Sequence, residues 1–300
     1  MKAKFVFEAF REESDPIEDM GIGQKAIIKQ WFKTWSPNVK YNINDNFGVV
    51  IDGDLELYEY KLYDIPIDNL NVRGDVLMTF SSIQSLPNNL SVAGYLDLEW
   101  SSIHVLPDNL RVDGGLYLRG TSITKLPYNL KINGHLDLER TQITEFPDNL
   151  QNVKGLNLRN TPISRLPDNL TVNGSLDLED SSISKLPSNL HVNKSLVLNY
   201  TDITELPDDL YVGGDLYLRG TKITKLPDNL IVGGYLDLSG TQITELPDNL
   251  SVGGSLDLKR TKITELPDNL RVDGWLDIRE TRITELQDNL NVKGTILKDF

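Results

Sequence analysis

The chain has 300 residues, contains no cysteine and carries a formal net charge of -14. This charge disfavours a nucleic-acid partner, because binding to a phosphate backbone requires concentrated lysine and arginine. The lack of cysteine excludes disulfides, thiolate metal sites and cysteine nucleophiles, and it favours a reducing compartment. The first residues are charged too early for a signal peptide, and no apolar run approaches the ~18 residues of a membrane span, so we expect a soluble protein that avoids membranes.

The first 23 residues hold three phenylalanines and an acidic run. Phe5, Phe7 and Phe10 precede the segment Glu12-Glu13-Ser14-Asp15. Two interpretations fit these residues equally well. The segment is either a docking peptide for a partner or part of an N-terminal cap.

The segment 24–35 predicts an amphipathic helix. Its apolar stripe consists of Ile27, Ile28, Trp31, Phe32 and Trp35, and Lys25, Lys29 and Lys33 lie on another face. The end of a stack of repeats exposes apolar surface and a sheet edge together, so we expect this helix to cover the first repeat that follows it. Binding to a membrane surface or to a partner is the alternative. The predicted domains are 1–42, an N-terminal segment with a capping helix, and 43–300, a repeat domain.

A 20-residue repeat begins near Val76 and continues to the C-terminus, after degenerate first strands between Ile43 and Leu57. One copy has too few apolar side chains to enclose a core, so we expect each copy to coil once and to stack on its neighbours. In a clean copy, the side chains expected in the core are Val232, Leu236, Leu238, Ile243, Leu246 and Leu250. The sequence therefore predicts a β-rich solenoid of 20-residue turns.

One stretch of each copy alternates apolar and polar residues, as Leu236-Asp237-Leu238 does, and this period of two predicts a β-strand. Stacked copies would form a parallel sheet along the concave face of a right-handed coil. A second stretch, from Leu250 to Leu256, alternates as well. A β-helix with two strands per turn is therefore the alternative fold.

Three other features of the repeat are predicted to be structural. Pro247 lacks the N–H of a sheet ladder, so its segment is expected to be a turn or an extended stretch rather than a central strand. Thr241 and Asn249, with their equivalents in other turns, are expected to hydrogen-bond to backbone groups at the bends. Near Val153 the valine and glycine of the repeat come one place late while the next leucine stays in register, which predicts a bulge.

The repeat motif Leu236-x-Leu238-x-x-Thr241-x-Ile243-x-x-Leu246-Pro247 resembles the short leucine-rich repeat L-x-L-x-x-N-x-L-x-x-L-P of secreted bacterial effectors. The chain is also similar to uncharacterised bacteriophage leucine-rich-repeat-like proteins, which open with a segment like Ser14-Asp15-Pro16-Ile17-Glu18-Asp19-Met20-Gly21-Ile22-Gly23. The resemblance covers residues 50–300, and it is specific for the fold rather than for the function. Thr or Ser replaces the usual Asn of the motif.

The resemblance implies a bacterial or bacteriophage protein that engages a host protein in the cytoplasm of the producing or infected cell. Some effectors of this type carry a cysteine-dependent ubiquitin ligase after the repeats. This chain has no cysteine, so that activity is excluded.

The residues suggest neither an active site nor a cofactor. No histidine is paired with a nucleophile, and no glycine-rich phosphate loop is present. The three histidines, His104, His135 and His191, lie far apart in the predicted coil.

A metal site is not predicted either. Asp237, Asp257 and Asp277 would stack on consecutive turns and could attract a cation, but Lys259 and Arg279 offer compensation within the chain. The glycine-aspartate pattern of calcium-binding β-rolls is also missing.

Candidate binding residues are expected where aromatic side chains gather on the outward face of the sheet, because exposed aromatics are enriched at binding hot spots. The first group is Tyr95, Trp100, Tyr117 and His135, with Arg119. The second group is Tyr200, Tyr217 and Tyr235, with Arg219 and the outward carboxylate Asp237. Trp275 lies alone toward the C-terminus. A ladder of alternating charges also faces outward and is interpreted as a solvated, self-neutralising surface, formed by Glu99, Arg119, Glu139, Arg159 and Glu179.

The sequence thus predicts a non-enzymatic interaction module that binds an unidentified protein through its concave face. Two alternatives stay open. One is a structural component that assembles end to end as a homo-oligomer, and the other is a carbohydrate-binding protein whose stacked aromatic side chains hold a sugar.

Overall fold

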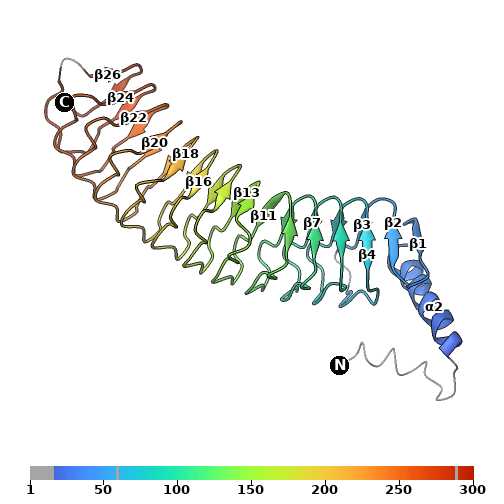
Figure 1. Cartoon of the computed structure of the whole chain (residues 1–300). Helices are drawn as coiled ribbons and strands as arrows, with labels where there is room; N and C mark the ends of the chain where they lie inside the picture. The colour runs from blue at the N-terminus through green and yellow to red at the C-terminus, as the bar shows by residue number, and fades with distance from the viewer. Residues whose placement is uncertain (1–16, 59–60, 288–289) are drawn as a thin grey trace. The chain divides into compact units, whose positions relative to one another are not determined.

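The computed structural model describes residues 17–58, 61–287 and 290–300 (Figure 1). The chain forms two compact units. Unit 1 holds the described residues up to Ile123 together with Pro127–Asn133, and unit 2 holds Thr124–Leu126 and Gly134–Phe300. The docking or capping role predicted for Phe5, Phe7 and Phe10 falls outside the described residues.

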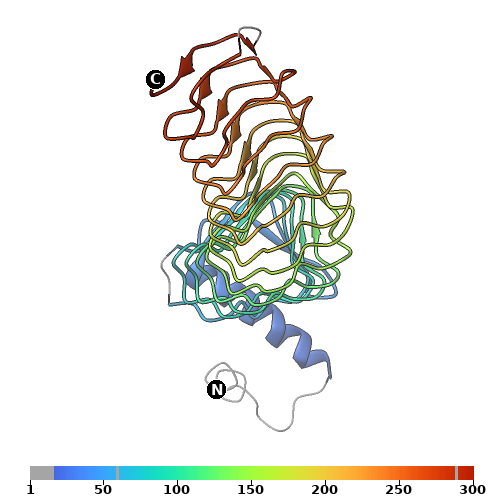
Figure 2. The ribbon, with the colours of Figure 1, turned by 90° about the vertical axis from the view of Figure 1, so that its left-hand side faces the viewer.

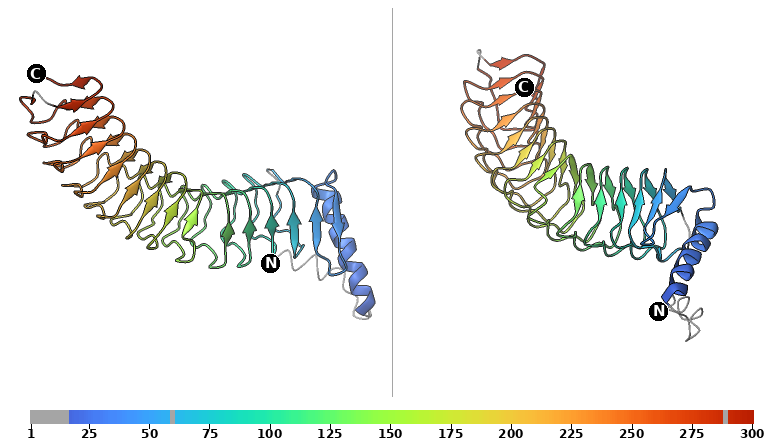
Figure 3. Two further views of the ribbon diagram at one scale, coloured as in Figure 1. Left: turned by 45° about the horizontal axis from the view of Figure 1, so that its top comes forward. Right: turned by 45° about the vertical axis from the view of Figure 1, so that its right-hand side comes forward.

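Helix α2 (Ile17–Trp35) contains the predicted amphipathic segment and begins earlier than expected, at Ile17 rather than at Gln24. The Phe32 ring stacks on Tyr41 of β1 (Tyr41–Ile43), with ring centroids 4.0 Å apart. Ile28, Trp31 and Phe32 are buried, and Ile27 and Trp35 are half-buried. The apolar stripe of the helix therefore packs against the first strands of unit 1, alongside which Figure 3 shows it.

Unit 1 contains two sheets with one short strand each per turn. The first has the order β1, β2 (Val49–Ile51), β4 (Leu70–Val72), β6 (Ser91–Val92), β8 (Arg111–Val112) and β10 (Lys131–Ile132), and only the β1–β2 pair is antiparallel. The second is parallel and contains β3 (Leu55–Glu56), β5 (Val76–Leu77), β7 (Leu96–Asp97) and β9 (Leu116–Tyr117).

Unit 2 repeats this arrangement with two parallel sheets, and Figure 2 shows its successive turns following the same path. We name them by their core side chains. The valine sheet contains β12 (Asn152–Val153), β14 (Thr171–Val172), β16 (His191–Val192), β18 (Tyr211–Val212), β20 (Ile231–Val232), β22 (Ser251–Val252), β24 (Arg271–Val272) and β26 (Asn291–Val292). The leucine sheet contains β11 (His135–Asp137), β13 (Gly155–Asn157), β15 (Leu176–Asp177), β17 (Leu196–Val197), β19 (Leu216–Tyr217), β21 (Leu236–Asp237), β23 (Leu256–Asp257), β25 (Leu276–Asp277) and β27 (Ile296–Leu297).

The predicted β-solenoid is confirmed, with two strands per turn as in the alternative version of the prediction. Leu236 pairs with Leu256, and Leu256 pairs with Leu276, so each turn advances the chain by 20 residues. We call the set of residues at the same place in successive turns a column. The predicted core columns are buried: Val232, Leu236, Leu238, Ile243, Leu246 and Leu250 are all 0–7% exposed. Each turn thus completes the core of its neighbours.

The threonine column bonds to the backbone as predicted. The Thr241 hydroxyl donates to the Leu238 carbonyl at 2.7 Å, and its backbone N–H donates to the same oxygen at 3.1 Å. The same hydroxyl bond is made by Thr121, Thr141, Thr161, Thr201, Thr221, Thr261 and Thr281. In these eight turns a threonine hydroxyl therefore closes the bend where the leucine-rich motif usually has asparagine, whereas the hydroxyls of Ser81, Ser101 and Ser181 at the same place make no such bond.

The bonds described for the asparagine column differ from the prediction. Asn189 donates from its side-chain amide to the side-chain oxygen of Asn169 in the preceding turn, at 3.1 Å, instead of bonding to the backbone. Asn89 and Asn269 bond in the same way to Asn69 and Asn249. The amides lie one turn apart, close enough for a ladder between side chains. The proline segment forms the predicted turn, since the Leu250 N–H donates to the Pro247 carbonyl at 3.1 Å.

The predicted irregularity near Val153 is present. Val153 pairs with Val172, a step of 19 residues, whereas Val172 pairs with Val192 and Leu156 pairs with Leu176. One extra residue thus precedes β12, and the bend between β12 and β13 is correspondingly shortened. This shift keeps the valine side chain in the core, where Val153 is 2% exposed.

The outward aspartates of the leucine sheet also have a structural task. In each case one side-chain oxygen accepts the backbone N–H of the residue two places later, as Asp177 does from Glu179 at 2.9 Å. Asp97, Asp137, Asp237, Asp257 and Asp277 make the same bond. Asn157 replaces aspartate in one turn and accepts the Arg159 N–H at 3.1 Å. Asn157 shows that the acceptor need not be charged, and Val197 and Tyr217 occupy the same position in other turns without this bond.

The threonine bond is testable with an isosteric substitution. Thr241→Val keeps the shape of the side chain but removes the hydroxyl, which is fully buried. We expect a loss of about 1 kcal/mol in unfolding free energy, the usual net value of one hydrogen bond. Urea unfolding followed by circular dichroism measures this loss, and Thr244→Val, which alters an exposed threonine of the same turn, is the control. Equal effects of the two substitutions would refute the assigned role.

The aspartate position predicts a difference between alanine and asparagine. Burial raises the pKa of Asp177 above its ordinary value, so folding disfavours the charged form of this carboxyl group. Asp177→Asn keeps the acceptor and should leave the unfolding midpoint in urea unchanged or higher. Asp177→Ala leaves the Glu179 N–H without its acceptor and should cost about 1–2 kcal/mol. If alanine and asparagine destabilise equally, the hydrogen bond does not stabilise the fold.

Candidate interaction surface

Three aromatic side chains of unit 2 form one continuous cluster on the outward face of the leucine sheet. Tyr217 lies in β19, and Tyr235 and Trp275 directly precede β21 and β25. The Tyr217 and Tyr235 ring centroids are 5.5 Å apart with an interplanar angle of 68°. The Tyr235 and Trp275 centroids are 5.6 Å apart at 48°. We call these three residues the aromatic cluster.

Short polar residues in the same column make this cluster possible. Tyr235 and Trp275 lie two turns apart, and Ser255 occupies the turn between them. Asp215 accepts the Tyr235 N–H at 2.8 Å, and the Ser255 hydroxyl accepts the Trp275 N–H at 3.1 Å. Because these residues are short, each ring can lean toward the next along the column. Trp275 is 37% exposed, so the cluster is open to solvent.

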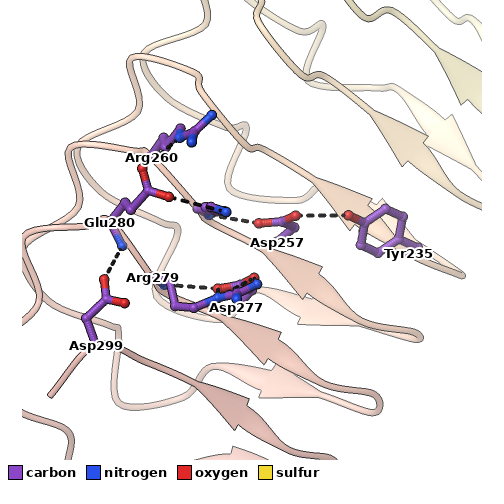
Figure 4. Close-up of polar contacts among 8 residues, drawn as sticks. Tyr235, Asp257, Arg260, Asp277, Arg279, Glu280 and Asp299 are labelled. Atoms are coloured by element: carbon purple, nitrogen blue, oxygen red, sulfur yellow. Dashed lines mark hydrogen bonds and ion pairs between the residues drawn. The ribbon is translucent and has the colours of Figure 1, made fainter.

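Carboxylates surround the rings. The Tyr217 hydroxyl donates to Asp215 at 3.2 Å, and the Tyr235 hydroxyl donates to Asp257 at 3.4 Å, as Figure 4 shows for the second pair. Burial raises the pKa of Tyr235 far above its ordinary value, and the negative charges of Asp237 and Asp257 raise it further. The hydroxyl groups therefore stay protonated and act as donors to the carboxylates.

Asp237, Asp257 and Asp277 stack on three consecutive turns beside the cluster. Burial raises the pKa of Asp257, and the like charges of Asp237 and Asp277 add to this effect. Asp277 differs from Asp257 because Arg279 donates to both of its oxygens (Figure 4). Burial alone would raise the pKa of Asp277, but the hydrogen bonds and charge of Arg279 outweigh it and leave this pKa below its ordinary value.

Two further cations near this stack are held by Glu280, which is not part of it. Lys259 forms an ion pair with Glu280 at 3.2 Å, and Arg260 forms one with the same carboxylate at 2.7 Å. Within the described part of the chain, Asp237 and Asp257 form no ion pair, and their bonds run to backbone N–H groups and to Tyr235. The surface beside the rings therefore carries two carboxylates that form no ion pair with the described residues, although the charge of Arg279 also acts on Asp257.

Two of the predicted site residues, Tyr200 and Trp100, lie at the bend after the strand rather than on the sheet. Tyr200 has a φ of 59°, and its ring covers Gly220, where a Cβ atom would lie 2.8 Å from a ring carbon. The Arg219 guanidinium carbon lies 6.0 Å from the centroid of this ring. Trp100, Arg119 and Gly120 form the same arrangement in unit 1, also with 6.0 Å between guanidinium and ring. The arginine and glycine of each arrangement belong to a copy of the sequence Leu-Tyr-Leu-Arg-Gly-Thr, and the aromatic residue lies in the turn before it.

The first predicted group is divided between the units. In unit 1 the Tyr95 and Tyr117 rings meet edge to face, with centroids 6.0 Å apart at 88°. His135 belongs to unit 2, where its ring covers Gly155 so closely that a Cβ there would lie 2.2 Å from Nδ1. The structure thus places Tyr95 with Tyr117 and gives His135 a packing role over glycine.

Sequence reasoning missed two contacts. Trp275 was expected to be alone, which is wrong because its ring reaches Tyr235 over Ser255. On the valine sheet, the His191 and Tyr211 rings stack with centroids 4.2 Å apart at 7°, and the next residue of that column, Ile231, is 60% exposed. The 20-residue spacing of these three positions was visible in the sequence and was the signal to follow.

The described residues contain no group of three or more side chains able to hold a metal ion. None of their helices has the length and apolar character that a membrane span needs. His191 bonds to the Asn193 side chain at 2.8 Å. In the predicted charge ladder, Arg159 pairs with Glu179 at 3.1 Å, while Glu139 lies 3.6 Å from Arg140.

The fold is shared with leucine-rich-repeat proteins of solved structure. YopM from Yersinia enterocolitica matches over 98% of this chain and 70% of its own chain, with 19% identity and a TM-score of 0.53. YopM from Yersinia pestis, described as a leucine-rich effector protein, matches over 92% and 99%, with 18% identity and a TM-score of 0.47. A leucine-rich-repeat protein of Leptospira interrogans matches over 77% and 79%, with 20% identity and a TM-score of 0.45. No protein-family model and no curated protein sequence matches the chain. At this level of identity the comparison with solved structures shows the fold alone, which is the leucine-rich-repeat solenoid.

Proposed function

We propose that this chain is a non-enzymatic interaction module that binds a protein partner on the outward face of the leucine sheet of unit 2. The observation that supports this most directly is the aromatic cluster of Tyr217, Tyr235 and Trp275. Exposed rings of this kind contribute most of the energy at many interfaces, because they bury large apolar areas and offer polar groups to a partner.

The rigidity of the surface supports the same proposal. Tyr235 and Trp275 are fixed by hydrogen bonds from their own backbone N–H groups to Asp215 and Ser255. Their strands are paired on both sides within the leucine sheet. A partner that binds here orders few side chains of this chain, which lowers the entropic cost of association.

The identity of the partner is proposed from the repeat motif alone. The likeness to bacterial effector and bacteriophage repeats leads us to propose a bacterial or phage factor that engages a host protein in the cytoplasm. The leucine-rich-repeat geometry would place the binding sheet on the concave side of the coil.

The two alternatives predict other surfaces. A sugar ring stacks on a flat aromatic face, whereas Tyr217 and Tyr235 meet nearly edge to face. Binding on a glycan array that depends on Trp275 would nevertheless favour the carbohydrate alternative over a protein partner. Light scattering tests end-to-end assembly, since a molecular mass that rises with concentration supports it and a constant monomer mass removes it.

The proposal predicts that removing the cluster abolishes partner binding without unfolding the chain. The triple variant Tyr217→Val, Tyr235→Ser and Trp275→Ser uses residues that other turns already have at these places, Val197, Ser195 and Ser255. We expect the loss of about 3 kcal/mol or more of binding free energy, because hot-spot aromatics contribute about 1–4 kcal/mol each and are not additive. Affinity capture from host cytoplasm is carried out with the unmodified chain and with the triple variant. Titration of the captured partner against each of them measures this loss.

The matched control for this test is Tyr128→Ser. Tyr128 is 70% exposed and lies in the proline turn of its repeat, and another turn has Ser188 at the same place. This variant also loses an exposed ring but should retain the partner. Capture that survives the triple variant, or that is lost equally with the control, would remove the aromatic cluster as the binding site.

A further inference from the structure

We propose that the segment recognised by the aromatic cluster is basic, and that it places lysine or arginine side chains against the rings and beside Asp237 and Asp257. This inference rests on the proposed function, since it names the chemistry of the partner at the same surface. It is carried by the combination of exposed aromatic side chains with two carboxylates that form no ion pair among the described residues.

The carboxylates beside the rings are the first part of the argument. Asp237 and Asp257 occupy paired positions in adjacent parallel strands, and neighbouring strands of a sheet lie about 4.8 Å apart. Only the next member of the stack, Asp277, has a cationic partner in the described residues, and that partner is Arg279. Two like charges at this separation repel each other, and a cation supplied from outside would relieve the repulsion.

The burial of these carboxylates strengthens the attraction. Asp237 is 9% exposed, and burial raises the pKa of Asp257. An anion that is poorly solvated interacts more strongly with an incoming cation than an exposed anion does, because the effective dielectric constant around it is lower. The surface therefore gains more from a basic side chain than scattered exposed carboxylates would.

The rings are the second part of the argument. Lysine and arginine bind to the faces of tryptophan and tyrosine, and tryptophan is the strongest partner. The described residues already make such contacts, with Arg219 over Tyr200, Arg119 over Trp100 and Lys298 over Phe300. At the aromatic cluster, by contrast, the adjacent cations Lys259 and Arg279 are engaged by Glu280 and Asp277. Within the described residues no cation lies over the Tyr235 or Trp275 ring, and Trp275 is 37% exposed to a partner.

The charge of the whole chain favours the same class of partner. A net charge of -14 attracts basic segments over several ångströms and raises their association rate. A free divalent cation is a weaker candidate, because the described residues contain no group of three or more metal ligands. An acidic or neutral segment would leave Asp237 and Asp257 uncompensated after losing water.

The test uses the full chain and labelled peptides of equal length in which serine alternates with arginine, with glutamine or with glutamate. Fluorescence anisotropy measures the affinity of each peptide, first at low and then at physiological salt. We expect the arginine peptide to bind and the glutamine and glutamate peptides to bind at least tenfold more weakly. At equal ionic strength, magnesium chloride should displace the arginine peptide no more than sodium chloride does.

Two pairs of substitutions separate this surface from general attraction to an acidic protein. Asp237→Asn with Asp257→Asn removes two charges beside the rings, and Asn157 shows that asparagine keeps the backbone hydrogen bond at this position. Asp137→Asn with Asp177→Asn removes two charges from the same column of unit 2, away from the aromatic cluster. We expect the first pair to weaken the arginine peptide about tenfold and the control pair to weaken it less than twofold.

The outcomes distinguish a failure of the basic-partner inference from a failure of the proposed function. Equal weakening by both pairs, or an arginine peptide that is unaffected by Tyr217→Val, Tyr235→Ser and Trp275→Ser, means non-specific attraction and overturns this inference. Equal binding of all three peptides overturns it as well. If the captured protein partner depends on the aromatic cluster but not on Asp237 and Asp257, the proposed function stands and the basic partner is refuted. If the captured partner binds the triple variant as well as it binds the unmodified chain, the proposed function itself is refuted.

Discussion

The whole structure depends on the match between one turn of the coil and the 20-residue period of the sequence. A turn cannot close a core by itself, since its apolar side chains are completed only by the same side chains of the turns before and after it. The backbone depends on neighbouring turns in the same way. The Leu236 N–H donates to the Ser255 backbone carbonyl of the next turn, and the Leu256 N–H donates to the Trp275 carbonyl of the turn after that. A change of pitch at one turn would therefore disturb both the ladder and the packing.

This constraint explains why many polar residues of the repeat bond to neighbouring parts of the coil. Thr241 closes the bend of its own turn, Asn189 bonds to Asn169, and Asp177 holds the Glu179 N–H. A substitution at these places is expected to leave the fold unchanged when it keeps the bond, as Asn157 does where neighbouring turns have aspartate. The irregular turn at Val153 obeys the same rule, since the chain shifts the register of one strand in order to keep the valine in the core.

The sequence predicted the fold well because its strongest signal, the identity of columns, is the interaction that stabilises the fold. It left open whether each turn has one strand or two, since the alternation around Val252 fits both, and it placed the asparagine bonds on the backbone. The candidate site was harder to predict. Trp275 seemed isolated because it lies two turns away from Tyr235. The two rings can meet only because the short side chain of Ser255, in the turn between them, leaves room. Such a contact depends on side-chain size in a third residue, which no periodicity reveals.

The stacking of equivalent positions in successive turns also limits what the outward face can recognise. Because every turn repeats the backbone at a fixed spacing, the face offers a regular row of positions, and specificity must come from which residues break the repetition. In unit 2 the breaks include the rings of Tyr217, Tyr235 and Trp275. Beside them lie the stacked carboxylates of Asp237, Asp257 and Asp277, each of which accepts a backbone N–H. Asn157 shows that the acceptor could have been neutral. The charge of Asp237 and Asp257 is thus not required by the backbone, and its position beside the rings is the feature that a cationic partner would use.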